Sequence, residues 1–130
     1  MNVKQLNELL ARGEVEREDM WPRLVEYESK ASPFHFEFGL KKLPLEPGVI
    51  LIRGPRQYGK STWLDLELRH TVIEHGKGTA FYANGDALRD HEDLYQILIS
   101  LDAAFAKAAK VRRIFVDEIT SVTKWEVAVK

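Results

Sequence analysis

The chain has no cysteine, which excludes disulfide bonds and metal sites with thiolate ligands. Its four histidines are scattered along the chain, and none belongs to a complete metal-binding pattern. We therefore interpret them as structural or surface residues. They are His35, His70, His75 and His91.

Long apolar runs are also missing. No stretch is long enough for a membrane-spanning helix, and the first residues lack the apolar core of a signal peptide. The formal net charge is only −1, so bulk charge does not indicate nucleic-acid binding. We interpret the basic pairs Lys41-Lys42 and Arg112-Arg113 as solvated surface charge. These absences predict a soluble, cytoplasmic protein with no membrane partner, and they leave a nucleic-acid partner open.

Residues 1–45 are expected to form a helical segment followed by a connector. Apolar residues at helical spacing predict two short helices before about residue 30. Asn2 and Asp19 are their candidate N-caps, with Pro22 in the first turn of the second helix. The proline-containing connector is expected to hold a short strand at 34–38.

Residues 46–130 alternate between strand and helix patterns, and this order favours a parallel sheet with right-handed crossovers. The sequence therefore predicts an α/β fold of three α/β/α layers, with three core strands in this chain. The expected strands are Val49–Ile52, Thr79–Ala83 and Arg113–Val116, and the expected helices run from about 60 to 75 and from about 90 to 110.

The string GPRQYGKST matches a phosphate-binding loop of one glycine, four residues, then glycine, lysine and serine. Such a loop wraps its backbone N–H groups around phosphate oxygens, and the following helix directs its positive end at the same anion. Lys60 is expected to reach the β- and γ-phosphates, Ser61 to offer its hydroxyl to Mg²⁺, and Thr62 to donate to a phosphate oxygen. The candidate nucleotide-binding residues are Gly54, Pro55, Arg56, Gln57, Tyr58, Gly59, Lys60, Ser61 and Thr62.

Contact with the nucleotide is less strongly indicated for Arg56, Gln57 and Tyr58, because residues inside such a loop more often face solvent. The alternative for the whole string is a chance match in a surface turn. The apolar run before it and the periodic helix after it argue against that alternative.

An acidic pair follows the third expected strand in the string RRIFVDEI. A carboxylate at the carboxyl end of a buried strand lies where such sheets bind ligands. Asp117 would hold the Mg²⁺ shell, and Glu118 would polarise a water for attack on the γ-phosphate. The catalytic candidates are thus Glu118 and Lys60, and the metal-binding candidates are Ser61 and Asp117. An ordinary acidic turn is the alternative, and the lack of an Asn-Lys-x-Asp string disfavours a GTPase.

Two strings, LIRGPRQYGKSTWL and IFVDEITSVTKWEVAVK, resemble the archaeal and bacterial AAA-type ATPases of the AAA_14 group, with their "GPRQxGKTT" and "DEIxxxxxWxxxxK" patterns. The resemblance covers about residues 45–130 and implies Mg-ATP as the bound nucleotide. Ser61 stands where many members have threonine, which keeps the hydroxyl. Thr120 stands where many have glutamine, so the role of that glutamine is not carried over to this chain. Trp125 is interpreted as a packing residue of the next helix.

The resemblance also implies the strand order 5-1-4-3-2, in which a fourth strand lies between the first and the third. That strand would follow Lys130, so the first and third strands would flank a gap. The strands could close on each other, or a second copy or a protein partner could complete the sheet. We favour a fragment of a longer protein, which predicts weak nucleotide binding and little or no hydrolysis by these 130 residues alone.

Thr123 and Glu126 have the spacing of a capping box, which predicts that a short helix begins near the carboxyl end.

Three functions stay open: an ATPase whose cycle drives a conformational change, a nucleotide-binding switch, and a non-hydrolysing remnant that acts through a protein partner.

Overall fold

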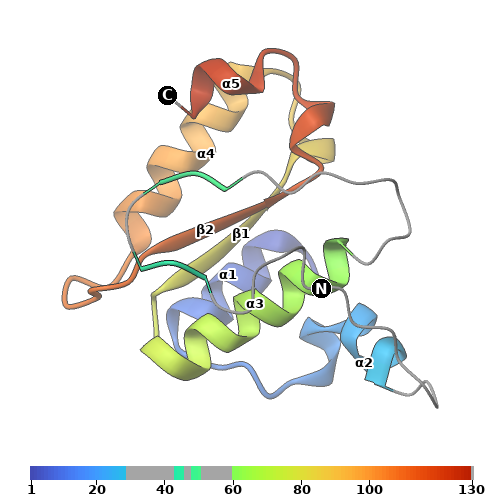
Figure 1. Cartoon of the computed structure of the whole chain (residues 1–130), viewed down its shortest axis with the longest axis vertical. Coiled ribbons are helices and arrows are strands. Elements are labelled where there is room, and N and C mark those ends of the chain that lie inside the picture. The colour runs from blue at the N-terminus through green and yellow to red at the C-terminus, as the bar shows by residue number, and fades with distance from the viewer. Residues whose placement is uncertain (29–42, 46–47, 51–59, 130) are drawn as a thin grey trace.

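The computed structural model describes residues 1–28, 43–45, 48–50 and 60–129 (Figure 1). The helices of these residues are α1 (Val3–Ala11), α2 (Pro22–Glu28), α3 (Lys60–His75), α4 (His91–Ala104) and α5 (Trp125–Ala128). The strands are β1 (Ala80–Asn84) and β2 (Arg113–Asp117). Single 3₁₀ turns occur at η1 (Glu18–Met20), η2 (Gly85–Ala87) and η3 (Ile119–Ser121).

The two strands pair in parallel, with Ala80 opposite Arg113 and Asn84 opposite Asp117. Both strands begin and end within one residue of the bounds expected from the sequence. Because parallel strands end at the same edge, the register brings the side chains of Asn84 and Asp117 to one edge of the sheet. The position of the acidic pair is therefore set by the pairing of β2 with β1.

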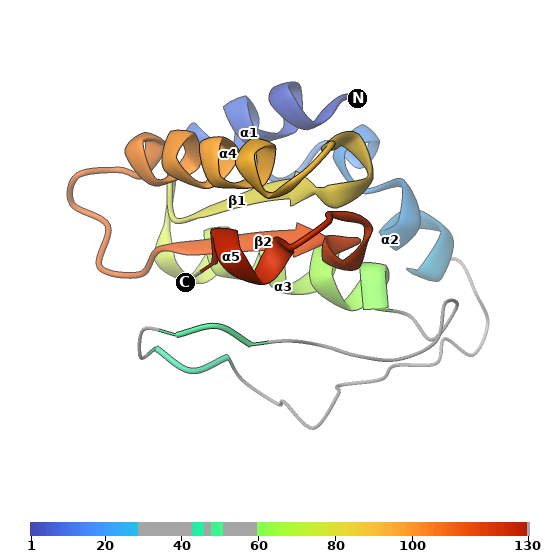
Figure 2. The same cartoon turned by 90° about the horizontal axis from the view of Figure 1, so that it is seen from above.

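Helices cover both faces of this small sheet. In Figure 1, α1 and α3 lie below the strands and α4 and α5 lie above them, and Figure 2 shows α1 on the β1 side of α3. Helix α3 packs across both strands, whereas α1 packs along β1 and α4 packs against α5. The described residues are thus arranged as an α/β fold, as expected.

The main core is formed by residues from both the amino-terminal segment and the strand–helix region. Phe81 of β1 and Leu68 of α3 are fully buried together with Leu10 and Leu24 from the first two helices. The Phe81 and Phe105 rings lie with their centroids 5.2 Å apart. Apolar burial of this kind is the main favourable term in folding, so residues 1–28 contribute to the stability of the sheet region. The division of the chain at residue 45 stays a prediction.

The first helix forms as predicted: the Asn2 side chain accepts from the Gln5 N–H, and Gly13 lies beyond its end with φ +78°. The predicted cap at Asp19 is wrong. Asp19 lies inside η1, and its carboxylate pairs with Arg17 at 2.7 Å. The second helix begins instead at Pro22, where the missing proline N–H costs no hydrogen bond.

Two expected features of the carboxyl-terminal half are also wrong. Helix α4 ends at Ala104 and not near residue 110, because Phe105 leaves helical geometry (ψ 143°) and buries its ring in the core. The capping box before α5 does not form. Lys124 occupies the cap position in the left-handed region, so Thr123 is outside it and makes an isolated bridge with Asp90. Trp125 packs against the second apolar cluster, around Leu94, as predicted.

The expected strand Val49–Ile52 is not seen in its described half. Val49 and Ile50 belong to no strand, and they are 68% and 47% exposed. In a strand that is buried on both faces, other residues cover the side chains on each side, and the exposure of Val49 and Ile50 shows that they are not covered in this way. Leu51, Ile52 and the strand expected at 34–38 lie outside the described residues. Among the described helices, none combines the length and the apolar character needed to cross a bilayer.

The outer edge of β1 is closed by one side chain of α1. The Asn7 amide donates to the Tyr82 carbonyl at 2.8 Å, and its carbonyl oxygen accepts from the Tyr82 N–H at 2.8 Å. Asn7 thus makes the two hydrogen bonds that a neighbouring strand would make at this position.

Asn7→Ala is expected to lower the free energy of unfolding by about 1–3 kcal/mol, because it leaves two half-buried backbone groups without partners. Glu8→Ala, at an exposed position of the same helix, serves as the control and should change it by less than about 0.5 kcal/mol. Urea unfolding followed by circular dichroism measures both. Equal effects of the two substitutions would contradict the edge contact.

Candidate functional site

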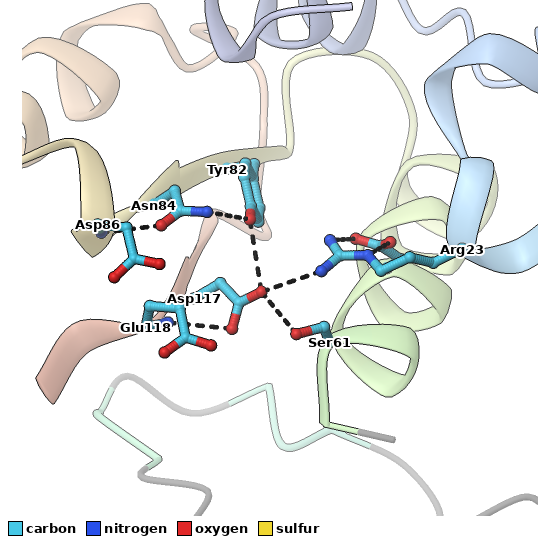
Figure 3. A network of polar contacts seen from close by, with 8 residues as sticks. Arg23, Ser61, Tyr82, Asn84, Asp86, Asp117 and Glu118 are labelled. Atoms are coloured by element: carbon cyan, nitrogen blue, oxygen red, sulfur yellow. Dashed lines mark hydrogen bonds and ion pairs between the residues drawn. The ribbon is translucent and has the colours of Figure 1, made fainter. Parts of the chain in front are cut away.

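Ser61 and Asp117 lie in direct contact at the carboxyl edge of the sheet (Figure 3). Ser61 is the second residue of α3, and Asp117 is the last residue of β2. The Ser61 hydroxyl donates to Asp117 Oδ2 at 2.8 Å, across 56 positions of sequence. The two residues expected to share a metal are therefore brought together by the packing of α3 on the sheet.

One oxygen of Asp117 accepts from three side chains. Besides Ser61, the Arg23 Nη1 lies 3.3 Å and the Tyr82 hydroxyl 3.5 Å from Oδ2. The other oxygen, Oδ1, accepts from the Glu118 N–H at 3.0 Å. Since the Asp117 side chain is only 11% exposed, these donors take over the role of water for this carboxylate.

Arg23 is anchored by a second carboxylate, Asp65 of α3. Its Nε and Nη2 bind the two Asp65 oxygens at 2.9 and 3.1 Å, which is a bidentate pair. The Asp65 side chain is 6% exposed, whereas that of Arg23 is 41% exposed. One guanidinium group thus serves two carboxylates that would otherwise repel each other.

The pKa values at this cluster follow from burial and charge. Burial raises the pKa of Asp65 above its ordinary value, Arg23 acts in the opposite direction, and nearby Asp117 raises it further. Burial disfavours the charged form of Arg23, but Asp65 and Tyr82 together outweigh burial, so the Arg23 pKa lies above its ordinary value. Burial, and then the Asp117 charge, also raise the pKa of Tyr82. Arg23 is consequently a permanent positive charge beside Asp117.

Glu118 directly follows Asp117 in the left-handed region, with φ 53° and ψ 41°. The Glu118 carbonyl lies so close to Gly85 that a Cβ on residue 85 would collide with it. The backbone of the acidic pair therefore packs against a glycine in the turn that follows β1, where a larger residue would not fit.

Polar contacts continue along the same edge. Asn84 donates to the Tyr82 hydroxyl at 3.3 Å and accepts from the Asp86 N–H at 2.9 Å (Figure 3). The Ser121 hydroxyl in turn donates to Asp86 at 2.6 Å. These contacts tie the turn after β1 to the turn after β2.

The phosphate loop itself falls mostly outside the described residues: this holds for Gly54, Pro55, Arg56, Gln57, Tyr58 and Gly59. Lys60 and Thr62 lie half-buried in the first turn of α3. The helix begins at Lys60, as the motif requires, so its positive end lies on the side from which the loop enters.

Sequence reasoning missed three members of the cluster: Arg23, Asp65 and Tyr82. Asp65 carried a usable signal, because it follows Ser61 by one helical turn and so shares its face. A charged residue on the sheet-facing side of a helix needs a partner. Nothing in the sequence marked Arg23, whose contacts with Asp65 and Asp117 span 42 and 94 positions.

The oxygens of Ser61 and Asp117 suit a magnesium ion, which prefers hard oxygen ligands and usually takes only one or two from the protein. The described residues hold no group of three or more His, Cys, Asp or Glu side chains placed to bind a metal. A metal at this place would therefore need further ligands from water or from phosphate, as magnesium in nucleotide sites does.

Ser61→Ala is expected to lower the free energy of unfolding by about 1–3 kcal/mol, because it removes a donor from a buried carboxylate. Ser121→Ala is the matched control: it also removes a hydroxyl from a carboxylate, but at an exposed place. Its expected effect is under about 1 kcal/mol, and urea unfolding compares the two. A larger effect of Ser121→Ala would count against the buried contact.

Comparison with known proteins gives one match. Residues 46–130 match the model of the AAA_14 family, described as an AAA domain. Neither curated proteins nor solved structures gave a match. The matched region contains α3, β1, α4 and β2 together with the Ser61–Asp117 contact. Since this region is more than half of the chain, the chain belongs to the AAA_14 family of AAA domains.

Proposed function

We propose that this chain binds Mg-ATP between its phosphate loop and Asp117, and that the AAA domain hydrolyses it to drive a conformational change. Family membership supports an ATPase-like nucleotide-binding function in general. The observation that carries the specific proposal is the 2.8 Å contact between Ser61 and Asp117. It joins the residue after the loop lysine to the acidic strand, which is the pairing that a magnesium–nucleotide site requires.

The phosphates would bind at the amino end of α3. The loop N–H groups and the helix dipole favour an anion there, and the Lys60 ammonium group adds a positive charge for the β- and γ-phosphates. Gly54, Gly59 and Thr62 complete the proposed phosphate site, and Pro55, Arg56, Gln57 and Tyr58 belong to the same loop.

Magnesium would be held by the Ser61 hydroxyl and, directly or through water, by Asp117. When bound, it supplies positive charge to the phosphate oxygens as the terminal phosphoryl group leaves. The protein's own contribution is to hold the Asp117 carboxylate in place, which it does through the Tyr82 hydroxyl and the Glu118 N–H.

Glu118 is the proposed general base. Its carboxylate would take the proton of a water molecule as the water oxygen bonds to the γ-phosphorus and the bond to the β–γ bridging oxygen breaks. ADP leaves with the bridging oxygen, and the proton passes from Glu118 to solvent. The close approach of Gly85 to the Glu118 backbone supports this role, because it fixes where the side chain starts.

The second candidate is a nucleotide-binding switch in which hydrolysis is incidental. It is favoured by the contact of Arg23 with Asp117, since this contact links the acidic strand to an amino-terminal helix. A third candidate is a non-hydrolysing remnant that acts through a second copy or a protein partner. In the described residues, β2 pairs only with β1, which leaves a side where a further strand could add.

Lys60→Ala is expected to weaken ATP binding at least about tenfold, because it removes the charge that faces the phosphates. Lys107→Ala, at an exposed place after α4, is the matched control and should bind ATP like the parent chain. Isothermal titration calorimetry with Mg-ATP measures both. Equal affinities of the Lys60 variant and the parent chain would refute the phosphate site.

Glu118→Gln is expected to keep ATP binding and to lower steady-state phosphate release by about a hundredfold or more, because an amide cannot take the proton. Phosphate release by the parent chain separates the candidates. Turnover that Glu118→Gln removes supports the ATPase, whereas binding without turnover in the parent chain supports a non-hydrolysing role for these 130 residues, as the switch or as the remnant. A variant that hydrolyses ATP as fast as the parent would exclude Glu118 as the base.

A further inference from the structure

Arg23 is the feature of the site that neither the loop motif nor the family match accounts for, since it lies in α2, before the matched region. Its guanidinium group contacts the carboxylate proposed to hold magnesium. Two cations would therefore compete for one oxygen. The inference that follows rests on the proposed function.

We propose that Arg23 stands in for the metal at Asp117 when the site holds no magnesium, and that Mg-nucleotide binding displaces it from Asp117 Oδ2. The arginine is then a positioning residue that lowers the affinity of the site for magnesium. Through it, helix α2 responds to whether Mg-nucleotide is bound.

The distances indicate which of the two Arg23 contacts would yield. The pair with Asp65 is bidentate at 2.9 and 3.1 Å, whereas the contact with Asp117 is single and longer, at 3.3 Å. The longer contact is the weaker one. Arg23 can therefore give up Asp117 while it keeps the charge partner that its location requires.

The number of donors at Asp117 Oδ2 also indicates that the contact with Arg23 is the one that would yield. Ser61, Tyr82 and Arg23 already direct donors at this one oxygen, so a metal or its water must replace at least one of them. Of the three, only Arg23 carries a positive charge that repels a divalent cation. Its side chain is also 41% exposed, which leaves it room to move toward solvent.

Exchange of Arg23 for magnesium at Asp117 would change the interactions that hold α2 as a whole. Leu24, the next residue, is 1% exposed in the main core, and α2 packs on α3. The core packing of α2 therefore opposes a shift of Arg23, whereas repulsion from the magnesium ion favours it. This arrangement couples nucleotide binding to the amino-terminal helices.

The test measures how strongly magnesium and nucleotide binding are coupled. Titration calorimetry gives the Kd of a non-hydrolysable ATP analogue in EDTA and in saturating Mg²⁺. The coupling ratio is the Kd in EDTA divided by the Kd in Mg²⁺, so a larger ratio means that magnesium strengthens nucleotide binding more. Arg23→Gln combined with Asp65→Asn removes the guanidinium charge without leaving the buried Asp65 carboxylate unpaired, and Asp117 keeps its donors Ser61 and Tyr82. Asp65→Asn alone keeps Arg23 but removes its anchor.

The coupling ratio of the double variant is expected to exceed that of Asp65→Asn by about three- to tenfold, because only the single variant keeps a cation beside Asp117. The single variant should itself fall below the parent chain, since Arg23 then has Asp117 as its only carboxylate partner in this cluster. Arg17→Gln, at an exposed arginine of the same segment, is the control and should match the parent. Arg23→Lys should raise the ratio above the parent, because one ammonium group cannot bridge both carboxylates.

A double variant whose ratio equals or falls below that of Asp65→Asn would overturn the inference. If the double variant does not fold, a ratio for Arg23→Lys at or below the parent value would overturn it. Failure of the proposed function looks different: the parent chain would then bind the analogue no better than Lys60→Ala does, in both EDTA and Mg²⁺.

Discussion

The arrangement of this protein depends on how one buried carboxylate is satisfied. Asp117 ends a strand in an almost water-free place, and a charge there is costly unless donors surround it. The donors come from three separate segments: Ser61 from α3, Tyr82 from β1 and Arg23 from α2. Each of these elements must pack in its place for the carboxylate to be stable, so the site and the fold stabilise each other.

The same dependence explains why the amino-terminal helices belong to the structural account of the site. Leu10 and Leu24 bury themselves with Phe81 and Leu68 in one core, and α2 then holds Arg23 over the acidic strand. Asp65 completes this arrangement, because it gives the arginine a fixed partner on the helix that also carries Ser61. Apolar packing places the helix, and the ion pair with Asp65 sets the direction of the Arg23 side chain.

Much of the site could be predicted from local pattern, because its two motifs are short and each has a fixed structural context. The start of α3 at Lys60 and the place of Asp117 at the end of β2 followed from the loop string and from an apolar run before an acidic pair. The packing of α3 on the two paired strands then brings them to one edge. The contact between Ser61 and Asp117 is the result.

The parts that could not be predicted depend on contacts between distant segments. Arg23 had no local signal, since its role exists only once α2 has packed on α3. Helix α4 ended early because Phe105 gained more from the core than from another helical turn. The capping box at Thr123 failed because the chain enters α5 through a left-handed Lys124. At the end of α4, tertiary packing thus overrode the local preference for helix.

The Asn7 side chain has a consequence for assembly. An amide group that occupies the N–H and carbonyl of Tyr82 denies them to any incoming backbone, and α1 shields the rest of that border. Among the residues that the structure describes, the edge at which a further strand could add is therefore that of β2. A polypeptide that adds there, whether from the same molecule or from another, would lie next to the strand that carries Asp117 and so beside the proposed nucleotide site.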